Sequence, residues 1–431
     1  MSIKTVKVKM WGSTIGYLHE QENGLIGFQY DDKFILSGIE VSPIKMPLSN
    51  ATYSFPSLNE ITYKGLPGML ADSLPDKFGN IVINRYLESQ GRQKDSLTTI
   101  EKLCYTGQRG MGALEYEPAQ KIVDLSEKID LDGLTKLASE ILSEKENIKL
   151  KYDDAMIAQL MQSSSPVGGA RAKTLIAWNE ATNDIRSGQV NAGAGFEYWL
   201  LKFDDIENNK DKDSTPDDKE YTKIEYAYYL MAKAAGIEMS ECRLYKENGR
   251  SHFMTKRFDR KGSNGEKIHM QSLCAMAHMD FNSPRDYSYE DAFAVMKQLN
   301  LGQHDFLQMF KRMLFNDYAK NFDDHTKNIA FLMDKTGKWS LSPAYDITFS
   351  YRKSSLWVRG HQMLINGKED GITKEDFYAV AKKVGIKKSS ATKCINQVSA
   401  AIEKWDEFAK EAGLSLKNTE RIKKQLKTDS N

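Results

Sequence analysis

The chain has 431 residues, of which 40% are hydrophobic and 28% are charged. This is an ordinary globular composition, so it excludes a disordered or collagen-like protein and predicts two or three domains. Sixty Lys and Arg residues against 59 Asp and Glu residues give a net charge of +1. A dedicated nucleic-acid-binding domain usually carries a basic excess, so DNA or RNA is not the default partner, and only a local basic patch stays open.

The cysteines and apolar segments bear on the cellular compartment in which the chain is expected. The four cysteines lie far apart, and the seven histidines form no HxxxH or HExxH pattern, so neither a disulfide scaffold nor a zinc site is expected. The first residues, MSIKTVKVKMWG, lack the apolar core of a signal peptide, and no run approaches the roughly 18 apolar residues of a membrane span. We therefore predict reduced thiols in a cytoplasmic chain with no membrane partner.

Residues 5–55 are predicted to be rich in β-strands. The sequence VKVKMW, starting at Val6, alternates with a period of two. Two further apolar segments, 26–30 and 34–36, flank the polar pair Asp31–Asp32, which is a hairpin pattern.

Helices are predicted to follow in this first part of the chain. Asp72, Ser73, Pro75 and Asp76 favour a turn or a helix start before an apolar helical period. A second helix is expected over 96–104, and the glycines of GQRGMGALEYEP then predict tight turns before a strand.

The remainder of the chain is predicted to alternate between helices and strands and then to become mainly helical. Patterns predict two helices within 125–162, strands at 174–178, 196–203 and 253–258, a turn-rich stretch at 182–195, a surface loop at 208–219, a helix at 224–235, and mainly helices over 285–431 apart from an irregular stretch around 321–366.

The segment richest in chemical groups is NFDDHTKNIAFLMDKTGKWSLSPAYDITFSYR, residues 321–352. Asp323 is followed by Asn328, then by a hairpin pattern with the turn DKTG, and then by Asp346. Phosphoryl transfer needs a carboxylate that accepts the proton of a hydroxyl, and an amide oxygen and second carboxylate that hold Mg²⁺ against phosphates. Protein kinases carry these groups in this order. The arrangement predicts phosphoryl transfer, and carboxylates that only cap helices and turns are the alternative.

A glycine-containing segment, VGGARAK at residues 167–173, precedes a predicted strand. Glycines there would let main-chain N–H groups approach phosphates without a clashing Cβ. The segment is not GxxxxGK[ST] and no helix is predicted after it, so a P-loop NTPase is disfavoured. A Gly-Gly hairpin turn is the alternative.

Lys202 lies inside the apolar strand pattern FEYWLLKF. Burying this lysine would be costly without an anionic partner, which ATP phosphates would supply. Glu225, in the following predicted helix, is the first candidate to fix the lysine. The alternative is an edge-strand lysine that reaches solvent.

The segment KRFDR, residues 256–260, follows another strand pattern. A strand that runs into a linker between two lobes could offer main-chain groups to an adenine. Arg257, Asp259 and Arg260 could equally form a surface ion-pair cluster.

Together these segments resemble the HipA family, the serine/threonine kinase toxins of bacterial type II toxin–antitoxin systems. The resemblance runs over nearly the whole chain. LADSLPD and GQRGMGA resemble the N-terminal subdomain, VGGARAK the ATP loop, LLKF the strand lysine and KRFDR the linker between lobes. FDDHTKN resembles the catalytic segment, usually D-x-H-x-K-N, and YDI resembles the segment of the metal-binding Asp.

The resemblance implies an α+β, two-lobed protein-kinase-like fold with a β-rich N-terminal subdomain and a mostly helical C-terminal lobe. The implied domains are the N-terminal subdomain at 1–120, the kinase N-lobe with the ATP loop at 121–265, and the helical C-lobe with the catalytic loop at 266–431.

Roles follow residue by residue from the same resemblance. Asp323 would accept the proton, and Lys202 would assist by screening the phosphates. Asn328 and Asp346 would bind Mg²⁺. The residues implied to contact ATP are Gly168, Gly169, Ala170, Arg171, Ala172, Lys173, Lys202, Lys256, Arg257, Phe258, His325, Lys327, Asn328, Tyr345 and Asp346.

Two departures from the family pattern bear on nucleotide binding and regulation. Lys256 stands where some relatives have Glu, which matters if that contact is made by the side chain. Pro166 stands where some relatives have a regulatory serine, and Ser163, Ser164 and Ser165 precede it. Autophosphorylation at Ser163–Ser165 would add about −1.5 to −2 charges and repel ATP. A flexible polar turn is the alternative.

The implied reaction transfers the γ-phosphoryl group of ATP to a Ser or Thr hydroxyl of a protein, in this family a translation protein such as an aminoacyl-tRNA synthetase. The implied partner is a small helix-turn-helix antitoxin, and operator DNA would be contacted mainly through it. Two other hypotheses stay open. One is a catalytically silent kinase-fold module that binds antitoxin and DNA, and the other is a small-molecule kinase with the same core chemistry.

Overall fold

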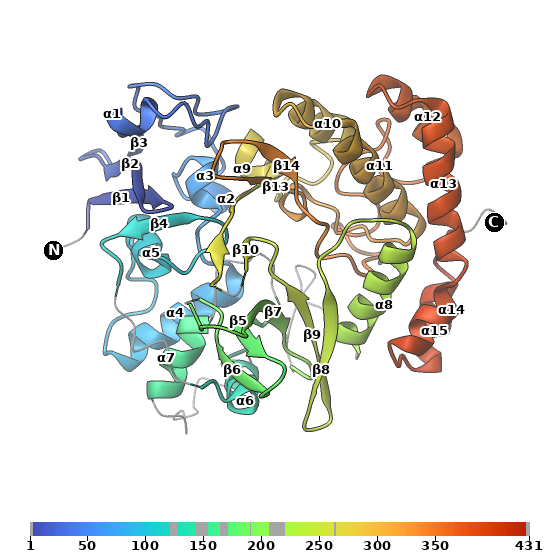
Figure 1. Cartoon of the computed structure of the whole chain (residues 1–431), viewed down its shortest axis with the longest axis horizontal. Helices are drawn as coiled ribbons and strands as arrows, with labels where there is room; N and C mark the ends of the chain where they lie inside the picture. The colour runs from blue at the N-terminus through green and yellow to red at the C-terminus, as the bar shows by residue number, and fades with distance from the viewer. Residues whose placement is uncertain are drawn as a thin grey trace. The chain divides into compact units, whose positions relative to one another are not determined.

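The computed structural model describes residues 3–120, 128–142, 154–163, 171–189, 191–206, 220–262 and 264–427 (Figure 1). The chain divides into two units. The first comprises Met1–Asp217, Tyr245–Gln271 and Leu332–Lys338, and the second comprises Asp218–Leu244, Ser272–Phe331 and Trp339–Asn431. Each unit is therefore built from three separate stretches of the chain. The division into residues 1–120, 121–265 and 266–431 stays a prediction.

The first unit begins with a four-stranded antiparallel sheet in the order β3–β2–β1–β4. Its strands are β1 (Thr5–Met10), β2 (Ser13–Glu20), β3 (Ile26–Tyr30) and β4 (Leu114–Glu117). The alternation predicted for β1 is confirmed, since Val6, Val8 and Met10 are buried and the two lysines between them are partly exposed. The tight turns predicted before β4 include Gly112, which has the left-handed backbone (φ 71°) that glycine adopts without strain.

The hairpin predicted around Asp31–Asp32 is wrong. A short helix, α1 (Asp32–Ile35), follows β3 in place of another strand. Asp31 caps this helix, because its carboxylate accepts a hydrogen bond from the main-chain N–H of Lys33. A two-residue hairpin turn needs the left-handed backbone that a glycine supplies, whereas an aspartate before a helix satisfies the N–H groups of the first turn.

The first unit also contains a series of helices after α1. They are α2 (Glu60–Tyr63), α3 (Gly68–Ala71), α4 (Lys77–Ser89), α5 (Thr99–Thr106), α6 (Leu131–Leu142) and α7 (Asp154–Ser163). The helix start predicted near Asp76 is confirmed, since its carboxylate accepts from the N–H of Gly79 and begins α4. A capping box of Thr98 and Glu101 begins α5. Apolar residues of α4, α6 and α7 share one core with Trp199 and Met254.

A five-stranded sheet in the order β6–β5–β7–β9–β8 supplies those core residues. Its strands are β5 (Lys173–Asn179), β6 (Asp184–Ser187), β7 (Glu197–Lys202), β8 (Cys242–Glu247) and β9 (Arg250–Lys256). Residues 198–202 of β7 are all buried, so both faces of the strand are covered and its sequence does not alternate. The stretch 182–195, predicted as turns, contains β6. Two short strands, β10 (Arg260–Lys261) and β11 (Glu266–Lys267), pair with each other.

The second unit is mostly helical, as predicted for the C-terminal part. Its helices are α8 (Tyr221–Ala234), α9 (Leu273–Ala277), α10 (Tyr289–Gln298), α11 (Gln303–Tyr318), the 3-10 turn η1 (Thr326–Asn328), α12 (Lys374–Lys383), α13 (Lys388–Ile402), α14 (Trp405–Glu411) and α15 (Leu416–Lys423). Helix α13 packs against both α8 and α11 (Figure 1).

A hairpin interrupts the irregular stretch that follows α11. Strands β12 (His269–Ser272), β13 (Ala330–Met333) and β14 (Trp339–Leu341) form a three-stranded sheet in that order. The predicted hairpin with the turn DKTG is confirmed. Asp334 accepts hydrogen bonds from the N–H groups of Thr336 and Lys338, and Gly337 has the positive φ of 84° that closes the turn.

Two predicted absences can be examined in the described residues. No helix among them has both the length and the apolar character needed to cross a bilayer. All four cysteines lie in the described part of the chain, where they are buried and form no disulfide.

Candidate active site

Helix α11 delivers the chain to the loop that carries Asp323. The helix ends at Tyr318, and Lys320 takes the left-handed backbone conformation (φ 54°), which turns the chain away from the helix axis. The loop then runs beside Ser350. The N–H of Phe322 donates to the oxygen of Ser350, and the N–H of Ser350 donates to the oxygen of Lys320, both over 3.0 Å. The start of the loop is thus fixed from two sides.

Residues 323–328 close into a compact loop. Nδ2 of Asn328 donates to the main-chain oxygen of Asp323 over 2.8 Å. The hydroxyl of Thr326 donates to the main-chain oxygen of Met279 over 2.6 Å. Because the amide nitrogen of Asn328 is engaged by the main chain, its amide oxygen is the atom that it can offer to a cation.

The side chain of Asp323 is anchored yet partly accessible. Its exposed fraction is 36%, and its Oδ1 accepts a hydrogen bond from Nε2 of Gln362 over 2.6 Å. Nε2 of His325 lies 3.8 Å from the same oxygen, which is too far for a hydrogen bond. A carboxylate that is held by one donor and still reaches the surface has the access that a proton acceptor needs.

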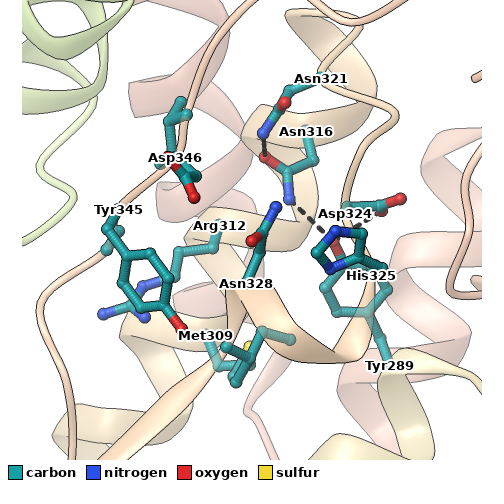
Figure 2. A pocket seen from close by; sticks show the side chains of 13 residues that line it. Tyr289, Met309, Arg312, Asn316, Asn321, Asp324, His325, Asn328, Tyr345 and Asp346 are labelled. Atoms are coloured by element: carbon teal, nitrogen blue, oxygen red, sulfur yellow. Dashed lines mark hydrogen bonds between the residues drawn. The ribbon is translucent and has the colours of Figure 1, made fainter. Parts of the chain in front are cut away.

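The second carboxylate, that of Asp346, follows the hairpin. The N–H of Ala344 donates to the oxygen of Glu238, and the hydroxyl of Tyr345 donates to the oxygen of Lys327, both over 2.7 Å. The segment is therefore tied to the Asp323 loop itself. Asp346 has a positive φ of 52°, which is uncommon for a residue other than glycine. Figure 2 shows its carboxylate and the amide of Asn328 directed towards the same part of one cavity.

This cavity lies wholly within the second unit. Asn328 and Asp346 give it an amide oxygen and a carboxylate, and Mg²⁺ typically takes one or two such protein ligands together with substrate phosphates. Among the described residues, no group of three or more His, Cys, Asp or Glu side chains could hold a metal ion by itself. The donor set therefore fits a Mg²⁺ ion that is shared with phosphates.

Arg312 contributes a buried positive charge to the wall of the cavity (Figure 2). It is 5% exposed, and its Nη2 donates to the main-chain oxygen of Ser342. Burial lowers the pKa of Arg312 to about 10, so the guanidinium stays charged at neutral pH. The arginine thus holds the main chain just before Tyr345 and Asp346.

A row of buried polar groups lies behind Asp323. The neighbouring Asp324, 3% exposed, accepts hydrogen bonds from the hydroxyl of Tyr289 (2.8 Å), from Nδ1 of His361 (2.6 Å) and from the N–H of Gln362 (2.8 Å). Nε2 of His361 lies 3.4 Å from Oδ1 of Asp317. His361 therefore stands between two carboxylates.

Positively and negatively charged side chains alternate along this row. Burial opposes a charged imidazole, but the carboxylates of Asp324 and Asp317 outweigh it and raise the pKa of His361 to about 9. Burial also opposes ionisation of Asp317, yet its hydrogen bond and attraction to His361 lower the pKa of Asp317 below its ordinary value. Nζ of Lys427 donates to Oδ2 of Asp317 over 2.6 Å and adds a second cation. Lys427, Asp317, His361 and Asp324 form what we call the charge row.

In the first unit, two lysines implied to contact ATP are neighbours. Lys202 at the end of β7 and Lys173 at the start of β5 are register partners, and they are 7% and 4% exposed. Because β7 is the middle strand, the alternative of an edge-strand lysine reaching solvent is wrong. Nζ of Lys202 lies 5.8 Å from the ring centre of Phe253, and Nζ of Lys173 donates to Asp76 over 3.1 Å.

The segment KRFDR holds a buried ion cluster. Asp259 is fully buried, and its carboxylate accepts from Arg257 over 2.8 and 2.9 Å, from Arg260 over 2.7 Å and from the N–H of Gly112 over 2.8 Å. Burial opposes ionisation, but the two arginines hold the pKa of Asp259 well below its usual range. The alternative of a surface cluster is therefore wrong, because these side chains are buried by contacts with a distant loop.

Arg257 and its neighbours use their side chains within the first unit. The guanidinium of Arg257 also donates to the oxygen of Gly188 over 3.0 Å. Lys256 forms an ion pair with Glu197 on β7. If residues 256–258 contact a nucleotide, main-chain groups are therefore the better candidates.

The other predicted site residues divide into described and undescribed ones. The ring centres of His325 and Phe281 lie 5.4 Å apart, and Nζ of Lys327 lies 5.2 Å from the Phe281 ring centre. Arg171 and Ala172 lead into β5, and Ser163 is the last residue of α7. Gly168, Gly169, Ala170, Ser164 and Ser165 lie outside the described residues.

Sequence reasoning missed Gln362 and the charge row. The contacts of Gln362 and His361 with Asp323 and Asp324 join residues 37 to 39 positions apart, and no short motif covers that separation. The doublet Asp323–Asp324 is the local signal for this arrangement, and the sequence motif gives a role only to its first member.

Comparison with known proteins adds to these observations. Residues 6–117 match a family model described as the HipA N-terminal domain, and residues 165–405 match one described as the HipA-like C-terminal domain. The chain is similar to HipA of Shewanella oneidensis MR-1, solved with HipB and operator DNA. The identity is 16% and the TM-score is 0.66, over 97% of this chain and 95% of that chain.

A second solved structure, the proinflammatory kinase CtkA of Helicobacter pylori, is 12% identical with a TM-score of 0.32. The match covers 53% of this chain and 88% of the CtkA chain. A TM-score this low supports no argument. No curated protein matches the chain.

The similarity over almost the whole length confirms the predicted α+β fold, which the chain shares with that HipA chain. The C-terminal family match alone spans more than half of the chain, and the N-terminal match covers the β-rich part ahead of it. The chain therefore belongs to the HipA family.

Proposed function

We propose that the chain is an ATP-dependent serine/threonine protein kinase that acts as the toxin of a toxin–antitoxin pair. The observation that carries this proposal is that two oxygen donors share one cavity of the second unit, and that a further carboxylate lies on the loop that supplies one of them. Asn328 and Asp346 line one cavity, and Asp323 projects from the same closed loop as Asn328. A proton acceptor beside two hard oxygen donors is the set that phosphoryl transfer requires.

The proposed step is a direct displacement at phosphorus. The hydroxyl oxygen of the protein substrate forms a bond to the γ-phosphorus, the bond from that phosphorus to the bridging oxygen of ADP breaks, and the hydroxyl proton passes to Asp323. Mg²⁺, bound by Asn328 and Asp346, would neutralise charge on the phosphates. Tyr345 and Arg312 hold the segment of Asp346 in place through their bonds to main-chain oxygens.

The first unit would contribute the nucleotide contacts. Two neighbouring buried lysines, Lys173 and Lys202, make this part of the sheet favourable for an anion such as a phosphate chain. The segment 256–258 would offer main-chain groups to the adenine, and residues 168–173 would follow the phosphates. These assignments rest on the family resemblance.

Partners and substrate follow from the family and from the solved relative. The HipA chain of Shewanella oneidensis MR-1 was solved with HipB and operator DNA, which supports an antitoxin and a DNA partner for this chain. That the antitoxin is a helix-turn-helix protein through which most of the DNA is bound follows from the family resemblance. A translation protein, such as an aminoacyl-tRNA synthetase, is the proposed substrate. Autophosphorylation at Ser163–Ser165 is proposed as a way to block ATP by adding negative charge.

Asp323→Asn tests the proposal directly. We expect the rate of phosphoryl transfer to fall by about 10³-fold, since an amide cannot accept the hydroxyl proton, while Mg·ATP binding is retained. The measurement is phosphopeptide mass spectrometry after incubation with Mg·ATP and a panel of aminoacyl-tRNA synthetases, together with calorimetric titration of Mg·ATP.

Asp334→Asn is the matched control, because it changes an exposed aspartate in the hairpin turn and should leave transfer unchanged. Full transfer by Asp323→Asn would contradict the proposal. Nucleotide binding without any transfer by the unaltered protein would favour the catalytically silent module that binds antitoxin and DNA.

A further inference from the structure

We propose that Gln362 is a positioning residue that orients the carboxylate of Asp323. His361 holds Gln362 in place, because both residues form hydrogen bonds to Asp324. We call residues 361 and 362 the clamp. The inference rests on the proposed kinase function, because it assigns Gln362 a role in the proton transfer to Asp323.

The clamp pairs two neighbouring residues with two neighbouring carboxylates. Nε2 of Gln362 donates to Oδ1 of Asp323 over 2.6 Å, and the N–H of Gln362 donates to Oδ1 of Asp324 over 2.8 Å. Nδ1 of His361 donates to Oδ2 of Asp324 over 2.6 Å. Three hydrogen bonds to charged acceptors thus connect the two dipeptides, and such bonds are stronger than neutral ones.

The clamp is buried, whereas the Asp323 side chain is partly exposed. Gln362 is 3% exposed, and its main-chain oxygen accepts a bond from the N–H of Arg285 over 2.7 Å. Its main chain is therefore held on both sides, by Asp324 and by Arg285. Asp323 is 36% exposed, and without a fixed donor its side chain would sample several rotamers. A proton acceptor must hold one orientation to meet the incoming hydroxyl.

The chemistry of the amide fixes its orientation. An ionised carboxylate accepts hydrogen bonds only, so the amide nitrogen of Gln362 must face Asp323 and the amide oxygen must face away. A glutamate at 362 would have the same shape but would place a second carboxylate 2.6 Å from the first. Gln362→Glu therefore removes the donor and adds repulsion while keeping the volume of the side chain.

His361 links the clamp to the rest of the unit. Its ring is fully buried between Asp324 and Asp317, and Lys427 contacts Asp317 from the other side. The charge row thus ends at Asp324, next to the reactive carboxylate. Displacement of His361 would move Gln362, which directly follows it in the chain.

The first test compares kcat and the KM for ATP in Gln362→Met, Gln362→Glu and the unaltered protein. We expect kcat to fall roughly 10- to 100-fold in Gln362→Met and further in Gln362→Glu, with the KM for ATP within about twofold, since a small misplacement of a reacting group costs about this much. Gln271→Met is the matched control. It removes a buried amide that donates to the main-chain oxygen of Val41 in the first unit, so kcat should not change.

A double-mutant cycle separates positioning from general damage. If Gln362 acts only through Asp323, adding Gln362→Met to Asp323→Asn should lower the residual transfer by less than twofold. A general structural defect would instead multiply the two losses. Multiplied losses, or an unchanged kcat in Gln362→Met, would overturn the clamp.

A second readout does not depend on activity. In protein labelled with ¹⁵N-glutamine, the side-chain amide signal of Gln362 is identified by its absence from Gln362→Met. We expect one of its protons to be shifted downfield and to lose that shift in Asp323→Ala. A signal that Asp323→Ala leaves in place overturns the clamp. If the unaltered protein transfers no phosphoryl group but the shift responds as expected, the contact stands and the proposed function fails.

Discussion

The two units bury histidine in opposite charge states. In the first unit, His252 and His269 are fully buried, and burial lowers their pKa values to about 4 and about 3. In the second unit, His361 is equally buried, but Asp324 and Asp317 raise its pKa to about 9. Burial is the same in all three cases, so the neighbouring groups decide the outcome. Nδ1 of His252 accepts a bond from the N–H of Asp204, which a neutral ring can do.

The buried ion pairs of the two units also differ, in how the charged groups are arranged. The cluster of Arg257, Asp259 and Arg260 in the first unit is closed on itself and on main-chain groups such as the N–H of Gly112. The charge row of the second unit is a line that ends beside Asp323. A closed cluster fixes the main chain, whereas a line can fix one particular side chain. We therefore expect damage to the first to appear mainly as lost stability.

The largest expected effect is that of Asp259→Ala. It would leave two buried guanidinium groups without their carboxylate, which costs about 3–5 kcal/mol. The measurement is urea-induced unfolding, with amide hydrogen exchange over residues 245–262 to confirm that the first unit is the one weakened. A loss below about 1 kcal/mol would show that the closed cluster is not a stabilising element.

The pH dependence of stability should differ between the units. The pKa of His361 is raised to about 9, so its contribution is complete below the unfolded value of about 6.5 and is lost as the pH rises through 9, a change on the order of 3 kcal/mol. The lowered pKa values of His252 and His269 give the opposite sign, with stability present above about 6.5 and lost as the pH falls through 4 and then 3.

Urea unfolding between pH 6 and pH 9.5 measures the alkaline part of this dependence. Lowering of the Asp317 pKa and raising of the Tyr289 pKa keep these two neighbours of His361 from titrating in that window. His361→Gln is the control, because it has no titrating ring and should lose most of the alkaline decline, leaving the smaller part that comes from buried thiols such as Cys104, whose pKa burial raises to about 11. An equal decline in that variant would remove His361 from the explanation.

The smallest expected effect is that of Lys427→Met. The ammonium donates to Asp317 and to the main-chain oxygen of Ile372, both over 2.6 Å, but the side chain is 27% exposed. Solvent screening reduces the loss to about 1 kcal/mol. Calorimetric unfolding would detect it, and kcat measured on the same variant would show how far along the charge row a change is felt.

Sequence patterns predicted the parts of the fold that depend on neighbouring residues. The alternation of β1, the start of α4 at Asp76 and the turn DKTG each reflect contacts within a few residues. Asp323, Asn328 and Asp346 were also within reach, because one loop and one hairpin connect them. The hairpin at Asp31–Asp32 failed because aspartate favours both turns and helix starts, and only the following backbone separates the two.

Features that depend on distant segments could not be predicted. The segment KRFDR looks like a surface cluster until the N–H of Gly112, 147 residues away, reaches Asp259. The clamp is similar, since nothing in the letters HQ shows that they will face Asp323 and Asp324. Such contacts are created by the tertiary fold, and a single sequence carries no local trace of them.

The way in which the units share the chain has a consequence for synthesis. The last stretch of the first unit is Leu332–Lys338, and it lies between Asn328 and Asp346. A nascent chain that stops before this stretch has neither a complete first unit nor the second carboxylate of the site. Completion of that unit and assembly of the site therefore fall within a few codons of each other. If the proposed function holds, a product that terminates before Asp346 would lack that carboxylate, so phosphoryl transfer would require synthesis of most of the chain.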